Sequence, residues 1–162
     1  MGIDSEIQGV TMKQILSMVS GTYGTPVYVF DTDSFQSRIK TVAEAFGSVG
    51  ICYCVKANPF LIAYVPEFVS RFEVCSYGEF CLCRNYEIEA EKIFYTGVYK
   101  EEEEIKDAIL YGVRCFSCES LTQLELLEHV ARDMKVELNI LLRLGTNNQF
   151  GMDEADIKTI IG

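Results

Sequence analysis

Basic residues are scarce in this sequence, and their scarcity argues against two classes of partner. Lysine and arginine together number 14, against 24 aspartate and glutamate residues, which gives a formal net charge of -10 and a pI near 4.6. Binding to phosphate backbones or to anionic membranes needs clustered lysine and arginine side chains. We therefore expect no nucleic-acid partner and no membrane partner, and we expect small molecules or other proteins in their place.

Long apolar runs are also lacking. No stretch is long enough to span a bilayer, and residues 1–6 show no basic region followed by an apolar run. These absences predict a cytoplasmic protein.

Histidine is nearly absent, whereas cysteine is not. The single histidine, His129, falls within a helical pattern and is expected to face solvent. Seven cysteines are an odd number for a secreted disulfide framework, and they lie on apolar stretches. The Cys115/Cys118 spacing matches a redox motif, but these residues fall on an expected strand and not at the start of a helix. We expect reduced thiols and no metal site.

Apolar strand patterns recur along the chain. They begin near positions 51, 72, 93, 115 and 137, a pitch of about twenty-two residues, and each is followed by a helical pattern. Strand then helix at this pitch predicts an α/β fold with a parallel sheet and right-handed crossovers.

Both a (β/α)8 barrel and an open doubly wound sheet fit this alternation. No strand is followed by a Gly-x-Gly-x-x-Gly turn, and a lysine at a strand end suits a barrel mouth. We favour the parallel (β/α)8 TIM-barrel type with only about its first five βα units present, because a closed barrel needs roughly 250 residues. The chain is expected to be truncated at its carboxyl end.

Two domains are expected: residues 1–24 as an amino-terminal helix and linker, and residues 25–162 as a partial barrel. Other expected elements are a helix within 1–20, a strand at 27–30, and helices at 35–46, 61–71, 100–111 and 119–132, with a last helix opened by Asp153 or Glu154.

The stretch 51–59 is the one around which the chain is organised. Alternation along a strand places Cys52, Cys54 and Lys56 on one side. An ammonium at the end of an apolar strand suggests a pocket. A lysine that merely protects a sheet edge remains the alternative.

Residues 53–58 resemble the cofactor-lysine motif of pyridoxal-phosphate enzymes with the alanine racemase-like barrel, in particular the diaminopimelate and ornithine decarboxylase group. Further motifs of that group are matched, in order, at residues 25–31, 72–79, 94–97, 142–144 and 149–152. The resemblance covers about residues 24–155.

The resemblance implies a pyridoxal 5'-phosphate cofactor and gives roles to four residues. Lys56 is implied to form the Schiff base, and Glu73 to be the acid beside it. Arg143 is implied to lie near the cofactor, and Ser76 to reach its neighbourhood with a hydroxyl. The alternatives are a rim carboxylate for Glu73, an arginine paired with an acid for Arg143 and a helix N-cap for Ser76. Exchange of the imine requires some unprotonated Lys56, which burial and nearby cations favour.

The resemblance also shows departures. Glu73 stands where aspartate is common, and Tyr77 replaces a small residue. The family's ring-stacking histidine, glycine-rich phosphate loop, pyridine-facing acid and partner-subunit cysteine are expected beyond the fifth strand.

The implied function is that of the amino-terminal portion of an amino-acid decarboxylase similar to diaminopimelate decarboxylase. It would act on a small-molecule amino acid as a homodimer. An amino-acid racemase or cofactor carrier of the same fold, and a catalytically incomplete interaction fragment, remain alternatives.

Overall fold

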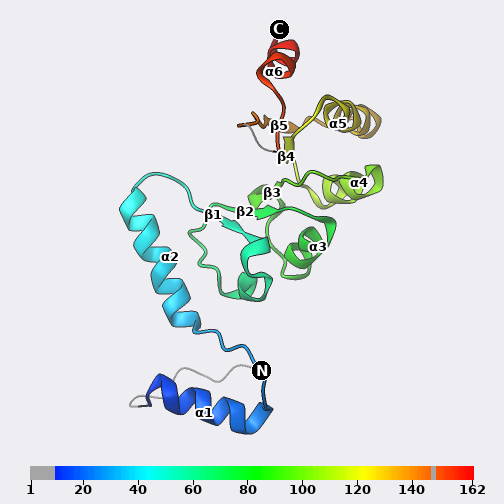
Figure 1. Cartoon of the computed structure of the whole chain (residues 1–162). Coiled ribbons are helices and arrows are strands. Elements are labelled where there is room, and N and C mark those ends of the chain that lie inside the picture. Colours follow the sequence, from blue (N-terminus) through cyan, green and yellow to red (C-terminus); the bar gives the residue numbers. More distant parts are fainter. Residues whose placement is uncertain (1–9, 147–148) are drawn as a thin grey trace. The chain divides into compact units, whose positions relative to one another are not determined.

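A five-stranded parallel sheet lies at the centre of the larger of two compact units (Figure 1). The computed structural model describes residues 10–146 and 149–162. The described residues up to Phe35 form one unit, and residues from Gln36 to Gly162 form the other. The expected division into domains at 1–24 and 25–162 stays a prediction.

The strands follow one another in the sheet in chain order. They are β1 (Cys52–Cys54), β2 (Arg71–Val74), β3 (Ile93–Tyr95), β4 (Cys115–Cys118) and β5 (Asn139–Leu142). Each neighbouring pair is parallel. A doubly wound sheet reverses its strand order at a switch point, whereas a barrel sheet does not. The sequential order therefore confirms the barrel type with five units.

Short polar residues and one glycine set the helix ends. The helices of the larger unit are α2 (Thr32–Phe46, which begins in the smaller unit), α3 (Tyr77–Asn85), α4 (Glu102–Tyr111), α5 (Leu121–Met134) and α6 (Glu154–Ile161). Asp31, Ser76, Ser120 and Asp153 accept hydrogen bonds from the first turns of α2, α3, α5 and α6. Gly112 ends α4 with a φ of 117°, which a side chain would disfavour. None of the described helices is both long and apolar enough to cross a bilayer.

One face of the sheet packs against helices α3, α4 and α5 and forms the core (Figure 1). The strands contribute fully buried side chains such as Val74, Tyr95 and Phe116. Phe80 of α3 stacks on Tyr95, with ring centroids 6.2 Å apart, and Tyr95 in turn stacks on Phe116 at 5.7 Å. This aromatic row joins the helices to the middle of the sheet.

The opposite face of the sheet is much less covered. Registered partners in a parallel sheet point to the same side, so Cys54, Glu73 and Phe94 share this face. All three are only partly buried and Leu141 of β5 is exposed, whereas Cys115 and Ser117 of β4, which share this face by register, are buried. The larger unit therefore presents a half-covered sheet face that ends at a polar edge.

The segment expected as a helix at 61–71 has a different structure. It contains a 3-10 helix at Pro59–Tyr64 and then turns. Pro66 cannot donate a backbone hydrogen bond, and the N–H groups of Ser70 and Arg71 both donate to the carbonyl of Ile51, at 2.9 and 3.2 Å. The start of β2 therefore draws the chain out of a helical path.

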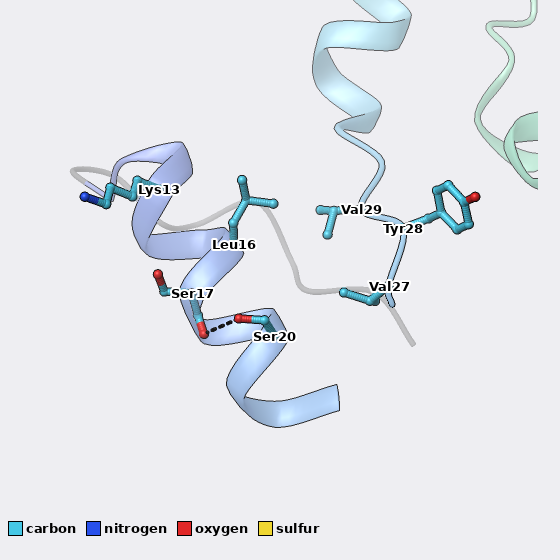
Figure 2. A pocket seen from close by; sticks show the side chains of 7 residues that line it. All are labelled: Lys13, Leu16, Ser17, Ser20, Val27, Tyr28 and Val29. Atoms are coloured by element: carbon cyan, nitrogen blue, oxygen red, sulfur yellow. Dashed lines mark hydrogen bonds between the residues drawn. The ribbon is translucent and has the colours of Figure 1, made fainter. Parts of the chain in front are cut away.

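The smaller unit contains α1 (Met12–Tyr23) and a segment without regular secondary structure after it. The expected helix within 1–20 is thus shifted toward the carboxyl end, with residues 1–9 outside the described part. Residues 27–30, expected as a strand, have no regular secondary structure and lie outside the sheet. Figure 2 shows a pocket in this unit, lined by Lys13, Leu16, Ser17, Ser20, Val27, Tyr28 and Val29.

Two neighbouring residues of α4 allow a matched test of the core. Ile109 is 2% exposed and Leu110 is 76% exposed. Ile109→Ala should lower the free energy of unfolding by about 2–5 kcal/mol, because it removes buried methyl groups and leaves a cavity. Leu110→Ala should change it by less than about 0.5 kcal/mol. Urea denaturation measures both, and equal losses would contradict this packing.

Candidate functional site

The carboxyl ends of the five strands carry the charged and polar side chains expected to form the site. Because the strands are parallel, these ends lie along one edge of the sheet. Lys56 follows β1, Glu73 lies within β2, Ser76 follows β2 and Arg143 follows β5. The charge of Glu73 acts on Lys56 and raises its pKa, whereas Ser76 and Arg143 make separate contacts.

Lys56 lies on a single 3-10 turn, Val55–Ala57, that begins where β1 ends. The hydroxyl of Tyr53 donates to the carbonyl of Asn58 at 2.7 Å and ties this turn back to the strand. Asn58 also caps the following 3-10 helix by accepting from the N–H of Phe60 at 3.1 Å. The expected alternation thus continues only to Cys54, and a turn presents Lys56.

The surroundings of Lys56 favour its charged form. The side chain is exposed. The sulfur of Cys75 and the carboxylate of Glu73 raise its pKa above the ordinary lysine value, and burial opposes them only weakly. We expected burial and nearby cations to favour the neutral amine, and in the described residues the neighbours are acids instead.

Glu73 is the centre of a hydrogen-bonded cluster. Cys54 Sγ donates to Glu73 Oε2 at 2.6 Å, and Thr96 Oγ1 donates to Glu73 Oε1 at 3.0 Å. Burial acts to raise the pKa of Glu73, but these hydrogen bonds and the charge of Lys56 outweigh it, so the pKa lies below its usual value. Burial and the Glu73 carboxylate raise the pKa of Cys54 to about 12. The cluster therefore joins an ionised carboxylate to a neutral thiol.

Ser76 is the N-cap of α3. Its Oγ accepts from the N–H of Glu79 at 3.3 Å, while the Glu79 side chain accepts from the N–H of Cys75 at 2.8 Å. Ser76 therefore caps the helix, and Glu79 fixes the residue that precedes the cap. The structure thus contains the cap, and contact of Ser76 with a cofactor stays a prediction.

Arg143 is paired with an acid that the sequence reading did not select. Its Nη1 donates to Glu119 Oε1 at 3.0 Å, and its guanidinium lies over the ring of Phe150, 4.9 Å from the centroid. The pair links the ends of β4 and β5.

Lys100 is a second lysine near this edge and is buried. Its Nζ donates to the carbonyl of Gly97 at 2.6 Å. Burial lowers its pKa to about 8, although Glu119 acts in the opposite direction. Gly97 has a φ of 98°, and a Cβ there would overlap the carbonyl of Cys75, so this turn depends on glycine.

Several contributors were therefore missed in the sequence. Thr96, Lys100 and Glu119 were each assigned to a strand motif or a helix start and given no role. Strand alternation was the available signal for Thr96, because Thr96 lies two residues after Phe94, which is registered with Glu73 on the half-covered face.

Thiols and histidine complete the description. All seven cysteines are free. No group of three or more histidine, cysteine, aspartate or glutamate side chains able to hold a metal occurs in the described ranges. His129 on α5 is largely exposed, as expected, and its Nε2 lies 3.8 Å from Glu102 Oε1.

Known relatives are similar over most of this chain. A diaminopimelate decarboxylase of Aquifex aeolicus is 33% identical over 140 residues, which cover 85% of this chain and 32% of that protein. One of Mycobacterium leprae is 32% identical over 134 residues, covering 80% and 28%. The chain thus spans about a third of the length of these relatives.

Solved structures show the same fold. A lysine/ornithine decarboxylase of Vibrio vulnificus, solved with putrescine, superposes with a TM-score of 0.81 at 21% identity, over 94% of this chain and 42% of that one. A diaminopimelate decarboxylase of Helicobacter pylori, solved with L-lysine, gives a TM-score of 0.80 at 22% identity, over 90% and 42%.

A family model described as the pyridoxal-binding domain of pyridoxal-dependent decarboxylases matches residues 32–156. This match covers the whole sheet and the edge that carries Lys56, Glu73 and Arg143. The resemblance read from the motifs is thereby confirmed, and the chain belongs to the family of pyridoxal-dependent decarboxylases through their pyridoxal-binding domain.

Proposed function

We propose that this chain is the cofactor-binding amino-terminal portion of a pyridoxal-phosphate-dependent amino-acid decarboxylase similar to diaminopimelate decarboxylase. The observation that carries the proposal is the family match across the sheet, together with an accessible lysine amine at its carboxyl edge. The proposed substrate is a small amino acid, which accords with the acidic composition of the chain.

The described residues fit part of a pyridoxal-phosphate site. Lys56 offers an exposed amine for covalent attachment of the cofactor, and Arg143 offers a cation at the same edge. Glu119 Oε2 is a buried oxygen without a hydrogen-bond partner in the described structure. Buried polar atoms in native proteins nearly always have a partner, so this oxygen leaves room for a donor from a bound molecule or from another part of the protein. When bound, pyridoxal phosphate supplies an electron sink for the electron pair that a departing carboxyl group leaves behind.

The residues of the chain would divide the remaining work. Lys56 would hold the cofactor through Nζ, and while its amine is free Cys75 and Glu73 favour its charged form. Glu73, fixed by Cys54 and Thr96, keeps negative charge beside that proton. Arg143 places positive charge near an anionic cofactor. Ser76, the N-cap of α3, would bring its hydroxyl into the neighbourhood of the cofactor.

The proposed setting is a homodimer in the cytoplasm. Seven free thiols accord with a reducing compartment. The half-covered sheet face and the ends of the sheet at β1 and β5 accord with association, because unpaired strand edges invite pairing.

Sedimentation of the 162-residue chain should show self-association, and a stable monomer at all concentrations would contradict this part of the proposal.

Covalent trapping tests the assignment of Lys56. The chain is incubated with pyridoxal phosphate, reduced with borohydride and mapped by peptide mass. We expect the added mass on Lys56 in preference to the exposed Lys40 and Lys158, which pair with Glu44 and Glu154. Binding of the anionic cofactor at the edge that carries Arg143 must then offset the raised pKa of Lys56. Even labelling of the surface lysines would contradict a tuned site, and selective labelling of Lys100 would transfer the role to that residue.

The acid beside Lys56 gives a test of its pKa. Glu73→Gln removes one of the charges that raise the pKa of Lys56, so that pKa should fall. More of the amine is then neutral at pH 8, and acylation of Lys56 by an amine-selective reagent should be faster. The control is Glu91→Gln, because Glu91 lies in the turn that precedes β3, at the other end of the strands. An unchanged pH dependence in Glu73→Gln would show that the two groups are not coupled.

A further inference from the structure

Glu119 is an acidic side chain buried at the end of β4. Its side chain is 4% exposed, whereas the side chain of its partner Arg143 is 47% exposed. Acidic side chains are almost never this buried unless they are paired. The burial of Glu119 therefore needs a reason.

The contacts of Arg143 come from two directions. Nη1 donates to Glu119 Oε1 at 3.0 Å, and the guanidinium plane lies over the Phe150 ring at 4.9 Å. A long side chain that is half exposed has many rotamers, and two such contacts restrict both its position and the tilt of its plane.

Glu119 itself stands on a rigid base. Its backbone N–H donates to Gln123 Oε1 at 2.9 Å, and Gln123 Nε2 donates to the carbonyls of Gly97 and Val98 at 3.3 and 3.1 Å. Ser120 caps the helix that carries Gln123. The backbone of Glu119 is thus anchored to α5 and, through Gln123, to the loop after β3. Arg143 is the more exposed partner of the ion pair.

Two further features set this pair apart from a surface ion pair. The buried ammonium of Lys100, 6% exposed, interacts electrostatically with Glu119, so the acid has two cationic neighbours. Glu119 Oε2 is buried and has no hydrogen-bond partner among the described residues. Stability alone would not favour a buried carboxylate with one oxygen unsatisfied.

We propose that Glu119 is a positioning residue, which holds the Arg143 guanidinium at the carboxyl edge in the orientation needed for an anionic group of the cofactor. The functional half of this inference, that Glu119 aids cofactor binding through Arg143, rests on the proposed function. The positional half, that Glu119 restricts the Arg143 guanidinium, concerns only the chain's own residues.

Chemical modification of arginine tests the positional half without cofactor. The chain is treated with an arginine-selective dicarbonyl reagent, and the rate at Arg143 is compared with that at the exposed Arg132 by peptide mapping. Glu119→Gln should speed modification of Arg143 about threefold to tenfold, the equivalent of roughly one lost charge-assisted hydrogen bond. Glu119→Asp, which keeps the charge, should restore part of the protection.

The control variant is Glu89→Gln, which removes an exposed acid from its ion pair with Lys92 and should leave the Arg143 rate unchanged. An unchanged Arg143 rate in folded Glu119→Gln would overturn the proposal. If Glu119→Gln does not fold, the original chain decides, because an Arg143 rate equal to that of Arg132 would show that the guanidinium is not held.

A double-mutant cycle tests the functional half. Glu119→Gln should weaken binding of pyridoxal phosphate about threefold to tenfold in the original chain but less than about twofold in an Arg143→Gln background. Equal losses in both backgrounds would show that Glu119 does not act through Arg143. If the original chain fails to trap cofactor on Lys56, the proposed function fails, whereas the modification rates still decide the positioning role.

Discussion

Parallel pairing in chain order is the constraint on which the rest of this structure depends. Because no strand is reversed, each crossover returns the chain to the same end, and every strand finishes at one edge. Glu119 and Arg143 meet there without any long loop, and Glu73 acts electrostatically on Lys56. The helix-covered face supplies the packing, and the edge can then carry charge without disturbing the core.

Charges of alternating sign follow this edge in chain order. Lys56 comes after β1 and Glu73 lies in β2, then Lys100 follows β3, Glu119 follows β4 and Arg143 follows β5. The first pair is open to solvent at its lysine, whereas the acid of the last pair is buried. Solvent screens charges less where they are buried. The attraction between Glu119 and Arg143 is therefore screened less than that between Lys56 and Glu73.

Much of the fold could be predicted from the sequence because its signals are local. The starts of the five strands, the Ser76 cap and the glycine stop of α4 each depend on a few adjacent residues. The failures have non-local causes. The 3-10 path before β2 depends on hydrogen bonds to Ile51, and residues 27–30 have a strand composition but lie outside the sheet. In the site, the role that the resemblance gives to Lys56 stays a prediction, and its pKa depends on Cys75 and Glu73, which lie after and within another strand.

The neutral thiol of Cys54 affects which nucleophile an electrophile meets at this edge. A thiolate is a far better nucleophile than a thiol, and a pKa of about 12 leaves almost no thiolate at neutral pH. Burial and the hydrogen bond that Cys54 donates to Glu73 thus keep Cys54 as a thiol two residues from Lys56. Cys75 and Glu73 favour the charged form of Lys56 at the same time, so at neutral pH both side chains are held in their protonated, weakly nucleophilic forms. Deprotonation of Lys56 is therefore the step that makes this part of the edge reactive toward an electrophile.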